Sequence, residues 1–147
     1  MSASATIKWK IQKKITWVEI IQFLRWNGWS FNDNGRMTYL PLNDNGNYDW
    51  QYEQIDEKKL VNLLTEKEKN KESLGVCITW KDTNIGGSLL TLNDEEMMLS
   101  IIINRQKITL CEGETITDVN WYLTRVNTVL LQKKDIEIIS TTFNECL

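Results

Sequence analysis

Carboxylates are the main side chains in this sequence that could perform chemistry, because its 147 residues include no histidine. Histidine is the commonest general base near neutral pH and the commonest metal ligand, so Ser-His-Asp and Cys-His catalysis are excluded. Asp49 and Glu53 could flank a sugar as the carboxylates of glycosidases do, but any acidic protein offers such pairs. A nuclease site is not expected either, since the run Glu66–Lys69 is typical of a solvated helix face. We therefore expect no catalytic residues and a protein that is not an enzyme.

Metal and phosphate sites are also not expected. The stretch from Asn43 to Asp49 is rich in Asn and Asp, which can bind calcium. However, Gly46 is not at the position where a calcium-binding loop requires a glycine. Gly86-Gly87 lacks the pattern of a phosphate-binding loop and instead predicts a bulge or a close backbone approach within a strand. We expect no metal and no cofactor.

The cysteines favour a reducing compartment. Cys77, Cys111 and Cys146 are odd in number, widely spaced and without the CxxC spacing of zinc or redox sites. The N-terminus lacks the apolar stretch of a signal peptide, and no apolar run has the length of a membrane span. We expect three free thiols, a cytoplasmic location and no membrane association.

The charges are distributed unevenly along the chain. Residues 37–57, which we call the acidic segment, contain five acids and no Lys or Arg, whereas residues 1–36 contain six basic residues and two acids. Aromatic side chains alternate with polar ones in the same segment, and such residues supply contact area to a partner at low entropic cost. The predicted partner-binding residues are Asp44, Asp49, Trp50, Tyr52, Glu53 and Asp56. The other interpretation is a solvated loop, with Asp56 as a helix cap and Trp50 in the core.

In general character the sequence resembles the immunity proteins of bacterial polymorphic-toxin systems. The features that it shares with them are Trp26-Asn27-Gly28-Trp29, the acidic aromatic run Tyr48–Glu53 and the absence of histidine. The resemblance implies a small binding protein that occludes a basic toxin domain with its acidic segment. Two alternatives stay open: a carbohydrate- or small-ligand-binding module that uses exposed Trp, and a metal- or carboxylate-dependent hydrolase. Nucleic-acid binding is not expected, because the formal net charge is −3 and the basic patch around Lys8–Lys14 is small.

Periodicity and turn residues predict the elements that must position these residues. Helices are expected after Thr16, which starts a capping box with Glu19, from Asp56 to about Asn70, and after Thr117. Gly28 should end the first helix. The strands are expected near residues 7–12, 29–31, 36–40, 48–53, 76–80, 85–92, 97–104, 107–111 and 136–142.

The order of these elements predicts the fold class. Runs of strands at hairpin spacing favour an α+β fold, with a mostly antiparallel sheet and about three helices packed on one face. We expect a single domain over residues 1–147, with residues 1–5 as a disordered tail and Asn32–Gly35 as the turn of a hairpin.

Overall fold

The computed structural model describes residues 4–146. Its main sheet has eight strands in the order β10-β1-β7-β6-β5-β3-β4, with β2 also paired to β5, and all of these pairs are antiparallel. The strands are β1 (Ser4–Lys13), β2 (Trp29–Ser30), β3 (Met37–Tyr39), β4 (Gln51–Glu53), β5 (Gly75–Trp80), β6 (Gly86–Thr91), β7 (Glu96–Ile103), β8 (Lys107–Thr109), β9 (Thr115–Thr117) and β10 (Ile136–Cys146). The helices are α1 (Trp17–Trp26), α2 (Glu57–Lys69) and α3 (Val119–Leu130), with a 3-10 turn η1 (Cys111–Gly113).

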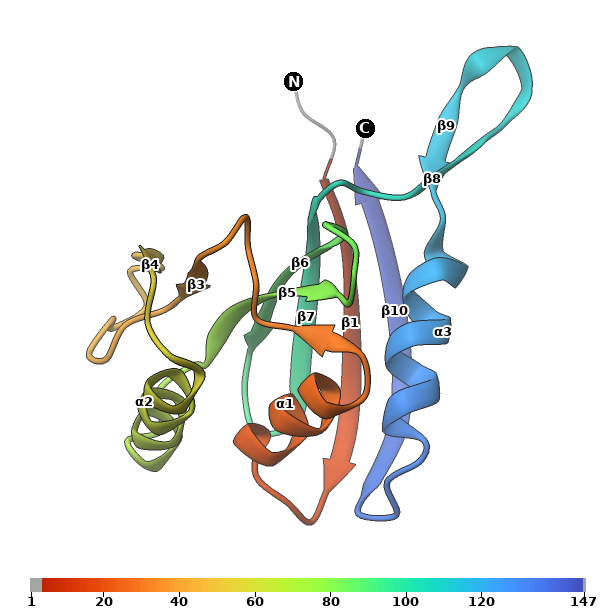
Figure 1. The fold of residues 1–147 in the computed structure, drawn as a ribbon. Coiled ribbons are helices and arrows are strands. Elements are labelled where there is room, and N and C mark those ends of the chain that lie inside the picture. Colours follow the sequence, from red (N-terminus) through yellow and green to blue (C-terminus); the bar gives the residue numbers. More distant parts are fainter. Residues whose placement is uncertain (1–3, 147) are drawn as a thin grey trace.

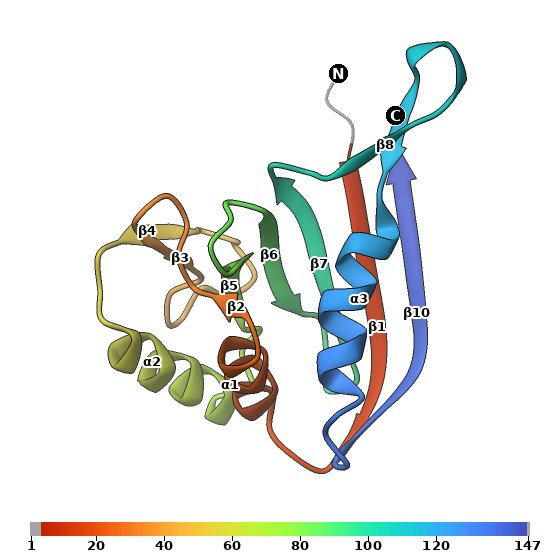
Figure 2. The ribbon, with the colours of Figure 1, turned by 45° about the vertical axis from the view of Figure 1, so that its right-hand side comes forward.

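The helices lie on one side of the sheet. Figures 1 and 2 show α1 and α3 in front of the strands, α2 beside α1, and the separate β8–β9 hairpin extending away from the body. The predicted α+β fold with a mostly antiparallel sheet is therefore confirmed.

The core lies between the sheet and the helices. Alternation in β1 buries Ile7, Trp9 and Ile11, each at most 1% exposed, and leaves Lys8 and Lys10 on the opposite face. From the helix side, the apolar face of α1 contributes Ile20, Ile21 and Leu24 to the same cluster. These are the contacts that the sequence periodicity predicted.

Local signals set the helix ends. The Thr16 hydroxyl accepts a hydrogen bond from the backbone N–H of Glu19 at 3.1 Å, as predicted for an N-cap. Gly28 follows the helix with a φ of +124°, which favours glycine. The cap of α3 was predicted one residue early: Asp118 is the N-cap, and Thr117 ends β9.

Long-range pairing corrects two other predictions. The predicted turn is present, since Asp33 and Arg36 exchange two backbone hydrogen bonds across Asn34-Gly35. However, β2 and β3 do not pair with each other, because both pair with β5 at successive positions along its edge. Ser4 and Ala5, expected in a disordered tail, begin β1 and pair with Cys146 and Glu145 of β10. The rest of that expected tail, residues 1–3, lies outside the described residues.

Close backbone approach explains the glycine pair in β6. A methyl group at Gly86 would lie 1.9 Å from the carbonyl oxygen of Ile78, and one at Gly87 would lie 1.9 Å from that of Ser100. The β6–β7 register also shifts between Gly86 and Ser88. Both the predicted bulge and the predicted close approach are therefore present.

Within residues 4–146, no helix combines the length and the apolar composition needed to cross a bilayer.

Candidate functional site

The acidic segment forms a lobe at the end of the main sheet opposite β10. It comprises β3, a loop, the short strand β4 and the start of α2 (Figure 1). A longer strand from Tyr48 was expected, but Tyr48 has a φ of +52° and only residues 51–53 pair with β3. The loop conformation therefore replaces the predicted aromatic strand face.

Asp44 holds this loop together. Its side chain is 7% exposed, and its two carboxylate oxygens accept hydrogen bonds from the backbone N–H groups of Tyr48 at 2.9 Å and Asp49 at 2.8 Å. A carboxylate that satisfies two backbone donors in this way stabilises the loop. In this conformation the Asp44 carboxylate is engaged within the loop and is not presented at the surface.

Asp56 and Glu53 are also bound within the protein. Asp56 is the N-cap of α2 and accepts a hydrogen bond from the backbone N–H of Lys59 at 2.7 Å. The exposed Glu53 accepts one from the Tyr39 hydroxyl at 2.6 Å. Burial, followed by this bond and the negative charge of Glu53, raises the pKa of Tyr39 to about 12, so Tyr39 remains a neutral donor.

Trp50 packs on the face of the sheet that the helices leave uncovered. A methyl group at Gly75 would lie 2.8 Å from Cη2 of Trp50 and 2.7 Å from the side chain of Leu40. Gly75 precedes the core residue Val76 in β5, so it faces away from the main core. Trp50 therefore covers a satellite cluster that includes the buried Leu40, and only part of its ring is exposed.

Two tyrosines and two exposed carboxylates, of which Asp49 is free and Glu53 accepts from Tyr39, make up the presented surface. Tyr48 and Tyr52 are 54% and 59% exposed, and Asp49 is exposed as well. The guanidinium of Arg36 lies 5.8 Å from the centre of the Tyr52 ring. We call Tyr48, Asp49, Tyr52 and Glu53 the tyrosine–carboxylate surface. Of the six predicted partner-binding residues, Asp49, Tyr52 and Glu53 belong to it.

A buried lysine fixes the base of the lobe. The sequence analysis placed it on a solvated face, although helical spacing puts position 67 on the same face as Leu60 and Leu64. Lys67 is 1% exposed, and its ammonium donates to the carbonyl of Pro41 at 2.6 Å and to Glu72 Oε1 at 3.1 Å. Burial acts to raise the pKa of Glu72, but hydrogen bonds from Lys67 and from the backbone of Asn43 outweigh it, and this pKa lies below its usual value. The lysine thus ties the loop to α2.

The prediction that the run Glu66–Lys69 is a solvated helix face is therefore wrong in part. Besides the burial of Lys67, Glu68 accepts hydrogen bonds from the backbone N–H groups of Trp17 at 2.8 Å and Val18 at 3.1 Å. It satisfies free donors in the first turn of α1, where a negative charge also complements the helix dipole. Only Glu66 and Lys69 are exposed as expected.

Trp26 is the one strongly exposed tryptophan among the described residues, at 73%. It lies off the apolar face of α1 and lines a pocket of about 250 Å³ with Phe31, Glu57 and Lys58. Trp26 also lines a second pocket, of about 420 Å³, together with Gly28 and Lys81. The helical period could have identified this residue, because position 26 does not continue the spacing of the buried positions.

The other tryptophans pack within the protein. Trp9, Trp17 and Trp29 are buried, and Trp50, Trp80 and Trp121 are half-buried. Arg125 lies between two of them, with its guanidinium 4.1 Å from the Trp121 ring centre and 5.5 Å from that of Trp80. This guanidinium occupies the aromatic site that an external cation could otherwise have used.

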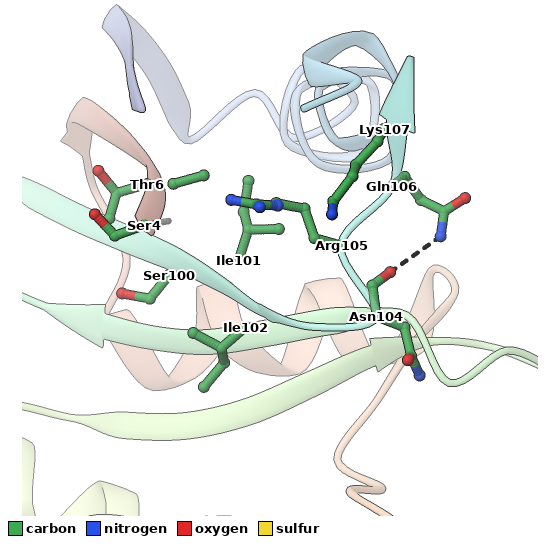
Figure 3. A pocket seen from close by; sticks show the side chains of 10 residues that line it. Ser4, Thr6, Ser100, Ile101, Ile102, Asn104, Arg105, Gln106 and Lys107 are labelled. Atoms are coloured by element: carbon green, nitrogen blue, oxygen red, sulfur yellow. Dashed lines mark hydrogen bonds between the residues drawn. The ribbon is translucent and has the colours of Figure 1, made fainter. Parts of the chain in front are cut away.

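A further cavity lies where β1 and β7 separate. The two strands pair from Thr6 to Lys10 only, and the segment 104–107 crosses over the resulting gap, which has a volume of about 800 Å³. Figure 3 shows the side chain of Arg105 extending from this segment towards Thr6, with Lys107 beside the same gap. Arg105 is already paired with Glu145 at 3.4 Å. The cavity offers hydroxyls and cations to a polar ligand, but no carboxylate pair and no activated nucleophile.

The described residues contain no group of three or more Cys, Asp or Glu that could hold a metal ion. All three cysteines lie in this part of the chain and are unpaired, and burial raises the pKa of Cys77 to about 12. Its thiol is therefore not an activated nucleophile.

Comparisons with known proteins add no family to this description. No protein-family model, no curated protein and no solved structure matches the chain.

Proposed function

We propose that this protein binds and neutralises a protein partner, as an immunity protein does, through the tyrosine–carboxylate surface. The observation that carries the proposal is the exposure of Tyr48 and Tyr52, each more than half accessible, beside the free carboxylate of Asp49. Tyrosines give large contact area with few rotatable bonds, and they are enriched at interfaces. The carboxylates favour a basic partner surface, such as that of a toxin domain, which the lobe would occlude.

The internal bonds of the lobe support this proposal. Asp44, Lys67 and Glu72 hold the loop that carries Tyr48 and leads into β4, where Tyr52 lies, and Asp56 caps the start of α2. A loop that is already ordered loses less entropy on binding than a mobile one. The predicted residues Asp44 and Asp56 then contribute by positioning the surface.

The first experiment identifies the partner by capture from the native host and mass spectrometry. Surface plasmon resonance then compares variants against that partner. We expect Asp49→Lys with Glu53→Lys to slow association and to flatten its dependence on salt, because long-range attraction mainly accelerates encounter. We expect Tyr52→Ala to speed dissociation, by about tenfold or more if it is a hot spot.

The matched control is Glu112→Lys with Glu114→Lys, which makes the same change of charge on the exposed turn of the β8–β9 hairpin. If the control slows association as much as the change in the lobe does, only the net charge matters. The tyrosine–carboxylate surface is then not the interface.

A second candidate function is supported by the exposure of Trp26. An exposed indole that lines two pockets could stack on a sugar ring or another flat ligand. Tryptophan fluorescence during titration with a panel of sugars tests this. A saturable shift that disappears in Trp26→Ala, but persists in Trp50→Phe, would support the carbohydrate-binding alternative.

A further inference from the structure

The tetrapeptide Asn-Asp-Asn-Gly occurs twice in this chain, at residues 32–35 and 43–46. Both copies place their Asn-Gly pair at the tip of an exposed turn, with a φ of +53° at Asn34 and at Asn45 and of +85° and +74° at the glycines that follow. Positive φ at both central residues is typical of a type I′ turn. The two sites therefore share their local sequence and the sign of their backbone angles, and they differ in their surroundings.

Asparagine is thermally labile in proteins, and Asn-Gly is the dipeptide that reacts most readily. The backbone nitrogen of the glycine attacks Cγ of the asparagine, so that a new N–Cγ bond closes a succinimide ring and the Cγ–Nδ2 bond breaks. The N–H proton passes through solvent to the leaving group, which departs as ammonia. Water then opens the ring at Cγ to give aspartate, or at the main-chain carbonyl carbon to give isoaspartate, in which the backbone runs through Cβ. Glycine favours the attack because it has no Cβ atom to hinder it.

Neighbouring groups hold the first copy in place. The Gly35 N–H, which must lose its proton and attack, donates to Oδ1 of Asn32 at 2.8 Å. The side-chain oxygen of Asn34 accepts from Nδ2 of Asn84 at 3.0 Å, and two backbone hydrogen bonds close the turn. Each bond that must first break slows the attack by about twofold to tenfold.

The second copy lacks these side-chain restraints. Within residues 4–146, neither the side chain of Asn45 nor the N–H of Gly46 makes a hydrogen bond. One backbone hydrogen bond, from the Asn47 N–H to the Asp44 carbonyl at 3.0 Å, closes this turn. The Asp44 carboxylate binds the backbone beyond the turn, at Tyr48 and at the residue after it. The peptide group between Asn45 and Gly46 can therefore rotate towards the side chain after the loss of a single bond.

A third Asn-Gly pair, Asn27-Gly28, is the most restrained of the three. Nδ2 of Asn27 donates to the carbonyl of Phe23 at 2.8 Å, and the carbonyl of Gly28 accepts from the backbone N–H of Lys81 at 2.8 Å. The Trp80 ring also packs on Gly28, since a methyl group there would lie 2.3 Å from it. This peptide group is fixed at the end of α1.

We propose that Asn45-Gly46 is a site of spontaneous deamidation, while the other two Asn-Gly pairs keep their asparagines in the folded protein. Aspartate at position 45 adds a carboxylate to the acidic segment, on the loop that also carries Tyr48 and Asp49. Isoaspartate lengthens the main chain inside the turn by the Cβ atom and so disturbs the bond that closes it. The modification does not depend on the proposed function, but its effect on partner binding rests on it.

Peptide mapping of the full chain by mass spectrometry tests the site. The native protein is kept in mildly alkaline buffer and digested with trypsin, which separates residues 26–36 from residues 37–58. Conversion at Asn45 should be faster than at Asn34 by about tenfold or more, because two side-chain hydrogen bonds hold Asn34 and the glycine after it. In urea the two tetrapeptides should react at similar rates. Equal rates in the native protein, or a difference that persists in urea, would overturn the proposal.

Asn84→Ala tests the reason for the difference without changing the Asn45 site. Asn84 is exposed, and its side chain supplies the bond to Asn34. The variant should raise the rate of conversion at Asn34 by about twofold to tenfold and leave the rate at Asn45 unchanged. An unchanged rate at Asn34 would mean that side-chain bonds do not protect that site, and Asn45 would lose its distinction.

Kinetics with the captured partner test the consequence for binding. Asn45→Asp reproduces the charge of the aspartate product, and Asn120→Asp makes the same change at an exposed position of α3, away from the lobe (Figure 1). Surface plasmon resonance should show about twofold faster association for Asn45→Asp and no change for the control. If the two variants behave alike while Asp49→Lys with Glu53→Lys slows association, the added charge has no role at the interface. If that lysine pair is also without effect, the proposed function fails, and the peptide map still decides the modification.

Discussion

Replacing Gly28 by alanine should destabilise the protein through two separate effects. The first is conformational, because Gly28 has a φ of +124°, where a Cβ atom is unfavourable. The second is steric, since the new methyl carbon would lie 2.3 Å from Cη2 of Trp80. That ring cannot move freely, because it packs edge-on against Trp29 with ring centres 5.4 Å apart and lies next to Arg125.

The size of the effect can be worked from these two terms. A left-handed conformation costs a non-glycine residue about 1–2 kcal/mol. Overpacking a well-filled site costs about 1–3 kcal/mol more. Gly28→Ala should therefore lower the free energy of unfolding by about 2–5 kcal/mol, a large part of the roughly 5–15 kcal/mol typical of a domain.

Gly35→Ala is the matched control. Gly35 has a φ of +85°, but no atom lies within 4 Å of an added methyl group, so only the conformational cost applies. Urea denaturation followed by circular dichroism should show a midpoint shift of about 1–2.5 M for Gly28→Ala, given a slope of about 2 kcal/mol per M. The control should shift by about half as much or less. Equal shifts for the two variants would refute the argument that Trp80 packs tightly on this turn.

Three further predictions concern side chains that are wholly or partly buried. Trp50→Ala should lower the melting temperature measured by calorimetry, because the ring covers Leu40 and Gly75, and an unchanged melting curve would show that Trp50 is a surface residue. Cys77 should not react with a thiol reagent in the native protein, whereas all three cysteine thiols should react in urea. A fast reaction of all three thiols in the native protein would contradict the burial of Cys77. Glu72 has a lowered pKa, so its contribution to stability is present above about pH 4.5 and is lost as the pH falls through the folded-state value. Glu72→Gln should therefore destabilise the protein at pH 7 but not at pH 2, as measured by urea midpoints, and equal losses at both pH values would exclude this charge effect.

Secondary structure in this protein was largely predictable, because its signals are local. The alternation of Ile7, Trp9 and Ile11 specifies a half-buried strand wherever that strand pairs. Likewise, Thr16 and Asp56 cap their helices through bonds to residues three positions away, so no distant contact is needed. The α+β class followed from the order of such elements.

The roles of the charged residues in the candidate site were not predictable in the same way. Asp44 and Asp49 lie in the same stretch rich in Asn and Asp, so the sequence gives no basis for assigning them different roles. In the structure, the Asp44 carboxylate is buried in a loop and the Asp49 side chain is exposed. Lys67 falls on the same helical face as Leu60 and Leu64, but its residue type predicts solvation, and its burial depends on the carbonyl of Pro41, 26 positions away. Burial of a charge is stable only where partners compensate its lost hydration.

The sequence by itself therefore determined which segments are strands and helices, and it located an acidic, aromatic segment. The tertiary structure decided which side chains of that segment remain available, which tryptophan is exposed, and that β10 is left at the edge of the sheet. The physical reason is that periodicity and capping act over a few residues, whereas sheet order and burial depend on contacts between segments far apart in the chain.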